Sequence, residues 1–138
     1  MRPIYETSAD RARENVVRQY LESKYACLYT PAEPLSPFDG VLKYPDGTVA
    51  AIVEIKTRKN TKNKYPTYML SAAKWESGRK VAEDLGVPFL LIVRFTDGVY
   101  VTKLKKEYPI NQGGRYDRND AQDVEPCVFI PMTDFREA

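Results

Sequence analysis

Two acidic residues and a lysine stand where the sequence could carry out metal-assisted chemistry. Glu54 and Lys56 lie two positions apart at the end of an apolar run that begins at Val49. In an extended strand alternate side chains project to the same face, so Glu54 and Lys56 share one face and Ile55 points to the other. Asp39 precedes the strand that leads into this run. Two carboxylates brought together repel each other unless a cation lies between them, so the pattern predicts a site for a hard divalent ion.

The reaction that such a site supports is phosphodiester hydrolysis. Carboxylate, carbonyl and water oxygens suit Mg²⁺, and Mn²⁺ is expected to substitute for it. An ion held by Asp39 and Glu54 would lower the pKa of a water molecule, and Lys56 would orient or deprotonate that water. The chain contains no histidine, which removes the reaction classes that activate a serine or cysteine nucleophile with an imidazole base.

The composition predicts one globular domain over residues 1–138. Apolar residues make up 43% and charged residues 29% of the chain, which is typical of a folded protein and too apolar for a disordered one. The sequence shows neither an apolar run of membrane-spanning length nor a secretory signal, so we expect a cytoplasmic protein without a membrane partner. Cys27 and Cys127 are too few for a zinc site, and two free thiols in a reducing compartment are expected.

The strands that carry the acidic residues are bounded by clear turn signals. Pro45-Asp46-Gly47 joins two strand-like runs, 41–44 and 48–57, and predicts an antiparallel hairpin. The second run is apolar along most of its length, which is typical of a central strand buried on both faces. Pro31 to Pro37 reads as an extended connection leading into this hairpin.

Helices are expected on both sides of the hairpin in the sequence. The first spans about Ala9 to Tyr25, with Thr7 or Ser8 as its N-cap. The second spans about Ser71 to Leu85 and ends at Gly86, with Pro88 just beyond.

Further strands follow the second helix. Residues 89–95 and 99–104 are predicted to form a second hairpin around Thr96-Asp97-Gly98. Residues 111–123 read as a flexible surface loop, and residues 127–130 as a short edge strand. This order of elements predicts an α/β sandwich in which a central mixed sheet is flanked by helices.

Basic residues cluster directly after the acidic site. The net charge of +2 says little by itself, but clustered cations favour a nucleic-acid partner. Two tyrosines interleave with these cations, a mixture suited to phosphate contact and base stacking. The residues predicted to bind nucleic acid are Arg58, Lys59, Lys62, Lys64, Tyr65 and Tyr68. Trp75 on the second helix is expected to be a packing anchor instead.

Pro37-Phe38-Asp39 followed by Val53-Glu54-Ile55-Lys56 resembles the signature of the PD-(D/E)XK nuclease superfamily. In this chain one residue separates the proline from the aspartate. The superfamily has a restriction-endonuclease-like fold with a core helix, a hairpin that carries the signature, a second helix and a further strand. The order expected over about residues 5–104 is similar. The chain resembles the small stand-alone nucleases of phages and bacteria, with a likeness to Holliday-junction-resolvase-like and VRR-type domains.

The resemblance implies roles for individual residues. Asp39 and Glu54 would bind the metal, the carbonyl of Ile55 would add a ligand, and Lys56 would position the attacking water. An acidic residue of the first helix often joins such a site, and Glu14 fits best, with Glu6 and Asp10 as weaker candidates. Lys74 on the second helix would contact the scissile phosphate.

The resemblance also implies a setting and a substrate. DNA is the expected substrate, in the cytoplasm of a bacterium or a phage-infected cell. A homodimer is expected if two strands must be cut together.

Two other interpretations remain open at this stage. The chain could be a nuclease-fold module that binds nucleic acid or a partner protein without cutting it. Alternatively, the match could be accidental, with Asp39 capping a turn and Glu54 and Lys56 forming a solvated strand pair. Loss of binding without loss of any activity on mutating Asp39 would favour the binding module. Absence of Mg²⁺ or Mn²⁺ binding would favour the accidental match, in which the chain is an unrelated α/β interaction protein.

Overall fold

The computed structural model describes residues 22, 27–33, 36, 38–113 and 125–137. In chain order its elements are β1 (Leu28–Pro31), β2 (Gly40–Lys43), β3 (Val49–Thr57), η1 (Lys62–Lys64), β4 (Thr67–Ser71), α2 (Ala72–Leu85), β5 (Phe89–Phe95), β6 (Gly98–Lys103), β7 (Ile110–Gly113), β8 (Glu125–Pro131), η4 (Met132–Asp134) and β9 (Arg136–Glu137).

The larger sheet has the order β1-β2-β3-β5-β6-β9. β3 is parallel to β5, whereas the other neighbours are antiparallel. The predicted mixed sheet and both predicted hairpins are therefore confirmed. β3 lies inside the sheet with five consecutive buried residues, Ala51 to Ile55, as the apolar run predicted.

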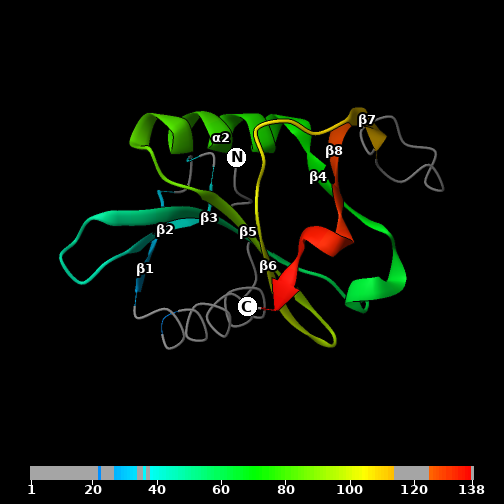
Figure 1. The fold of residues 1–138 in the computed structure, drawn as a ribbon, viewed down its shortest axis with the longest axis horizontal. Coiled ribbons are helices and arrows are strands. Elements are labelled where there is room, and N and C mark those ends of the chain that lie inside the picture. Colours follow the sequence, from blue (N-terminus) through cyan, green and yellow to red (C-terminus); the bar gives the residue numbers. More distant parts are fainter. Residues whose placement is uncertain (1–21, 23–26, 34–35, 37, 114–124, 138) are drawn as a thin grey trace.

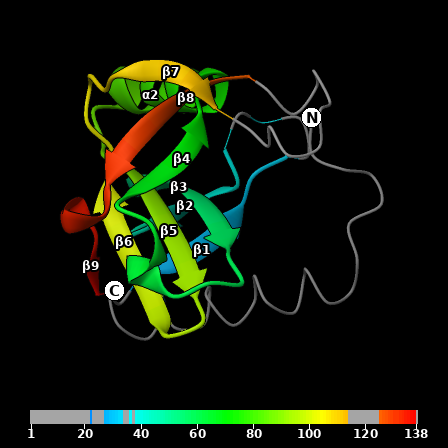
Figure 2. The same ribbon diagram turned by 90° about the vertical axis from the view of Figure 1, so that its right-hand side faces the viewer.

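A second sheet with the order β4-β8-β7 lies with helix α2 on one side of the larger sheet (Figures 1 and 2). Their apolar side chains share a core with the inner face of the larger sheet. Ile52 and Leu91 come from that face, Leu70 and Ile130 from the second sheet, and Trp75 from α2. On the opposite face of the larger sheet the buried residues are Cys27, Tyr29, Leu42, Val53, Ile55 and Ile92. The two faces of β3 thus contribute to different clusters.

The C-terminus of α2 confirms the predicted glycine stop. Gly86 adopts a left-handed conformation with φ of 68°, which glycine accepts without the steric cost of a Cβ. Its N–H donates to the carbonyl of Glu83 at 3.1 Å, and the N–H of Val87 donates to the carbonyl of Ala82 at 3.0 Å. These hydrogen bonds end the helix, and the chain then continues into β5.

Five of the described strands differ from the sequence expectation. β4 was not predicted, because it runs into α2 without an intervening turn residue. β1 and β9 were not predicted either. β7 occupies residues 110–113, so the start of the predicted loop 111–123 is a strand. The strand at 127–130 exists as part of β8, but it lies between β4 and β7 and is not an edge strand.

Some expectations fall on residues outside the described ranges. Of the first predicted helix only Glu22 is described, and it is helical. Glu14, Glu6, Asp10 and Pro37 lie outside the described residues, as does the predicted loop from residue 114 onward. Among the helices that the structure describes, none is long and apolar enough to cross a membrane.

Candidate active site

Asp39 is held directly against the strand that carries Glu54. Its N–H donates to the carbonyl of Val53 at 3.0 Å, and its Oδ2 accepts a hydrogen bond of 2.7 Å from the N–H of Ile55. Both bonds go to neighbours of Glu54 in the chain. The side chain of Asp39 is 8% exposed. The structure therefore brings the two predicted carboxylates together at the start of β2 and near the end of β3.

Gly40 lets the chain turn tightly after Asp39. A Cβ at this position would come within 2.6 Å of the Tyr29 ring and 2.7 Å of the carbonyl of Thr30. Such separations are too short for a side chain, so only glycine fits here beside β1. The close approach of β1 and β2 thus helps to fix Asp39 in place.

Glu54 is a buried carboxylate without hydrogen bonds. It is only 1% exposed, and neither Oε1 nor Oε2 has a hydrogen-bond partner among the described residues. Burial, followed by the negative charge of Asp39, raises the pKa of Glu54 to about 8, although Lys56 and Lys74 oppose the shift. Burial of an isolated carboxylate is costly, so its neighbours must compensate.

Lys56 lies on the same face of β3 as Glu54, as the alternation of the strand requires. Burial lowers the pKa of the Lys56 ammonium, and the nearby positive charge of Lys74 lowers it further, while Glu54 and Asp39 oppose the shift. A lysine with a lowered pKa gives up its proton more readily and can then accept one. The side chain is thus suited to orienting or deprotonating a water molecule.

Lys74 reaches the same site from α2. Its Nζ lies 3.7 Å from Oε1 of Glu54, while almost half of its side chain remains exposed to solvent. The start of α2 follows β4 directly, which places this lysine beside the end of β3. The structure therefore gathers four of the five residues predicted to carry the chemistry: Asp39, Glu54, Lys56 and Lys74. The fifth, Glu14, is not described.

The carboxylate pair fits a hard divalent cation. Two buried carboxylates held side by side would be stabilised by a positive ion between them. Among the described side chains, no three Asp, Glu, Cys or His residues gather into one group, so further ligands would have to be backbone carbonyls, water or residues outside the described ranges. The carbonyl of Ile55 follows Glu54 immediately in the chain. The burial of Glu54 and Asp39 also argues against a solvated strand pair.

The basic segment after β3 is anchored on the turn between β5 and β6. The N–H of Lys62 donates to Oδ1 of Asp97 at 3.0 Å, and the N–H of Thr96 donates to the carbonyl of Asn60 at 3.0 Å. The ammonium of Lys62 lies 5.2 Å from the ring centre of Tyr100. These hydrogen bonds hold the backbone of the segment in place, so its lysine side chains extend from fixed positions.

The two tyrosines of this segment differ in exposure. Tyr65 is 54% exposed and has the ammonium of Lys64 5.4 Å from its ring centre, so it remains able to contact a base. Tyr68 is only 4% exposed and packs against Phe95 and Phe135. The prediction that Tyr68 stacks on a base is wrong, because its ring belongs to the core. The sequence gives no clear signal of this burial, because Tyr68, Met69 and Leu70 form a continuous apolar run and not an alternation of apolar and polar residues.

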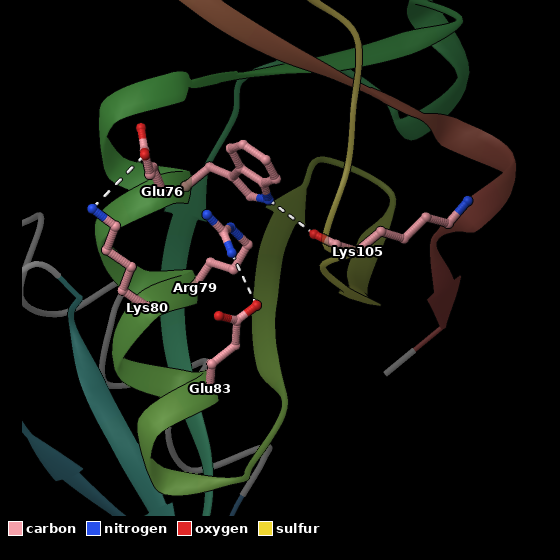
Figure 3. A network of polar contacts seen from close by, with 6 residues as sticks. Glu76, Arg79, Lys80, Glu83 and Lys105 are labelled. Atoms are coloured by element: carbon pink, nitrogen blue, oxygen red, sulfur yellow. Dashed lines mark hydrogen bonds and ion pairs between the residues drawn. The ribbon is translucent and has the colours of Figure 1, made fainter.

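The part of α2 beyond Lys74 has a structural role (Figure 3). The indole Nε1 of Trp75 donates to the carbonyl of Lys105 at 3.0 Å, which confirms that Trp75 is a packing anchor. Arg79 pairs with Glu83 at 2.9 Å, and Lys80 pairs with Glu76 at 3.8 Å. Two cavities of about 810 and 750 Å³ are not lined by Asp39, Glu54 or Lys56.

The mixed α/β fold and the D…ExK arrangement define a class, the PD-(D/E)XK nucleases. Residues 1–138 match the model of a family described as "Phage putative PDDEXK endonuclease", and the chain belongs to this family. No curated protein matches the chain.

Among solved structures, the chain is similar to a Holliday junction resolvase from Archaeoglobus fulgidus. The TM-score is 0.47 and the identity 18%, with 67% of this chain and 74% of the resolvase covered.

Proposed function

We propose that the protein is a metal-dependent nuclease that hydrolyses the phosphodiester bonds of DNA. The observation that supports it best is the Glu54 carboxylate, which is buried beside Asp39, Lys56 and Lys74 and has no hydrogen-bond partner in the described part of the chain. Charged groups that are already arranged for a reaction stabilise its transition state, even where this arrangement lowers the stability of the fold. A buried carboxylate beside a second one is such a cost, which the ammonium of Lys74 at 3.7 Å offsets only in part. Membership of an endonuclease family agrees with this proposal.

In this proposal Asp39 and Glu54 hold Mg²⁺ or Mn²⁺, with the carbonyl of Ile55 as a further ligand. The bound ion supplies positive charge that acidifies water and offsets the charge developing on the phosphate. Lys56 orients the attacking water and takes up its proton, which its lowered pKa favours. Glu14, outside the described residues, remains a candidate for an additional acidic ligand.

Lys74 binds a non-bridging oxygen of the scissile phosphate in this proposal. Its ammonium is within ion-pair distance of Glu54 and is partly exposed, so it can turn from the carboxylate to an incoming phosphate. A metal ion held by Asp39 and Glu54 would then supply the positive charge beside Glu54. The substrate strand continues along Arg58, Lys59, Lys62 and Lys64, with Tyr65 in contact with a base.

Cleavage assays with defined metals and substrates test the proposal. Purified protein is incubated with Mg²⁺, Mn²⁺, Ca²⁺ or EDTA and with supercoiled plasmid, linear duplex, single strand or a four-way junction. Cleavage is expected with Mg²⁺ and Mn²⁺ only, because the looser coordination of Ca²⁺ orients water poorly. Glu54→Gln serves as a matched inactive control. Robust cleavage in EDTA, or cleavage by Glu54→Gln at the wild-type rate, would contradict the proposal.

A further inference from the structure

Arg58 extends the row of site residues one step beyond Lys56. Although β3 ends at Thr57, the N–H of Arg58 still donates to the carbonyl of Arg94 at 2.9 Å, so the extended backbone continues through this residue. Glu54, Lys56 and Arg58 therefore alternate along one strand and lie on the same face. The contact of Arg58 with Tyr68 supports this placement of Arg58, because Tyr68 belongs to the core cluster on the same face of the sheet.

Tyr68 provides a rigid surface for the Arg58 guanidinium. The central carbon of the guanidinium lies 4.9 Å from the centre of the Tyr68 ring, which is within the range of a cation–π contact. The ring is wedged against Phe95 at 6.5 Å and Phe135 at 5.9 Å between ring centres. A ring packed in this way cannot move aside, so it holds the guanidinium in one place.

The hydroxyl of Tyr68 takes no part in this arrangement. It is buried and has no hydrogen-bond partner among the described residues. Burial raises the pKa of Tyr68 to about 12, with the charge of Glu54 raising it and that of Arg58 lowering it. Tyr68 therefore stays neutral across the working pH range, and its contribution comes from the ring face.

We infer that Arg58, held by Tyr68, binds the phosphate next to the scissile one, and that Tyr68 is a positioning residue; this inference rests on the proposed function. Two residues of a strand advance by roughly 6.6 Å, which is similar to the spacing of neighbouring phosphates along a nucleic-acid strand. With the scissile phosphate at the reacting centre beside Lys56, Arg58 therefore lies about one phosphate spacing further along the substrate strand. Arginine forms paired hydrogen bonds with a phosphate, and holding its side chain in advance reduces the entropy lost on binding.

A single neutral phosphate in the substrate tests the contact. The substrate is an oligonucleotide duplex with one mapped cleavage position, in which a methylphosphonate replaces the phosphate on either side of that position in turn. In the wild-type protein one of these two replacements should raise KM about tenfold or more, since a charge-assisted hydrogen bond is lost. Arg58→Ala should raise KM similarly on the unmodified duplex and should no longer respond to that replacement. The effect on kcat should be small in comparison.

Variants of Tyr68 test the positioning role. Tyr68→Phe keeps the ring and should keep the wild-type KM. Tyr68→Leu removes the ring face and should raise KM as Arg58→Ala does, and the double variant should be no worse than Arg58→Ala alone. Thermal melting of every variant separates this effect from a loss of the fold. If Tyr68→Leu fails to fold, Tyr68→Met takes its place, because the longer and flexible methionine side chain fills more of the space of the ring and still lacks its aromatic face.

Several outcomes would overturn the inference. An unchanged KM in Arg58→Ala, or a variant that still responds to the methylphosphonate, would remove the contact. A Tyr68→Phe variant as impaired as Arg58→Ala would assign the effect to the hydroxyl. If the wild-type protein cleaves no DNA with any divalent metal, the proposed function fails separately. Fluorescence anisotropy with unmodified duplex would then test whether Arg58→Ala weakens DNA binding, with Kd in place of KM.

Discussion

The carboxylate of Asp39 accepts a hydrogen bond of 2.7 Å from the N–H of Ile55, the residue between Glu54 and Lys56. This bond gives Asp39 a structural role beside its proposed role as a metal ligand. The two roles can be separated, because an amide side chain also has an oxygen that accepts a hydrogen bond but lacks the negative charge.

We expect Asp39→Asn to lose cleavage and to keep most of its stability. Asp39→Ala should lose cleavage and also about 1 to 3 kcal/mol of stability, since the buried N–H of Ile55 loses its acceptor. Urea unfolding and Mn²⁺-dependent plasmid cleavage, measured for both variants, provide the comparison. Equal stability of the two variants would mean that the hydrogen bond contributes little.

The neighbours Ile55 and Lys56 should show opposite profiles. Lys56→Ala should lower kcat by about a hundredfold or more, in the range of a general base, and should barely change stability because it leaves no cavity in the core. Ile55 is 8% exposed and packs in the cluster on the other face, so Ile55→Ala should cost about 2 to 5 kcal/mol of stability. Melting curves and single-turnover cleavage measure both effects. Wild-type cleavage by Lys56→Ala would remove this lysine from the mechanism.

The stability of the metal-free protein should depend on the protonation of Glu54. The pKa of Glu54 is about 8 in the folded protein and near the ordinary value of 4.5 when unfolded. Between these values the folded state binds more protons, so the contribution of Glu54 is complete below pH 4.5 and is lost as the pH rises through 8. Urea unfolding in EDTA at pH 5 and pH 9 measures this loss.

Glu54→Gln serves as the control for that pH dependence. It should lose less stability between the two pH values, because glutamine does not ionise. Saturating Mn²⁺ should restore stability to the wild-type protein at pH 9 but not to the variant. Parallel pH profiles of the two proteins would show that the Glu54 pKa is not raised.

Lys74 is expected to act on the phosphate. Lys74→Met should lower kcat by about tenfold or more, since it removes a cation from the reacting centre. It should not weaken Mn²⁺ binding, because a neighbouring positive charge opposes a metal ion. Lys80→Met is the matched control, as Lys80 pairs with Glu76 on the helix surface. Calorimetric titration with Mn²⁺ and cleavage rates test both variants. A loss of Mn²⁺ affinity in Lys74→Met would contradict the expected role.

The basic segment should account for part of the salt dependence of DNA binding. Reversing the charges of Lys62 and Lys64 together should flatten the dependence of log Kd on log salt by roughly one to two units, since fewer counterions are released. The same reversal at Lys80 and Lys106 gives a control with equal charge change. Anisotropy titrations at several salt concentrations provide the slopes. Equal slopes for both double variants would place the DNA on another surface.

The sequence by itself determined the elements whose signals are local. The β2–β3 hairpin follows from its Pro45-Asp46-Gly47 turn, and the end of α2 follows from Gly86, because turn and cap preferences depend on a few neighbouring residues. The common face of Glu54 and Lys56 follows from the two-residue period of a strand. The proximity of Asp39 to Glu54 was predictable for the same reason, since both lie on one hairpin.

The tertiary structure decided what depends on distant contacts. β4 carries no turn signal before α2, and its strand state comes from pairing with β8. Tyr68 looks like a surface residue beside lysines in the sequence, yet Phe95 and Phe135 enclose it. The burial of Glu54 and the 3.7 Å approach of Lys74 arise from the packing of α2 on the sheet. Periodicity assigns a side chain to a face, but only the packed fold determines what covers that face.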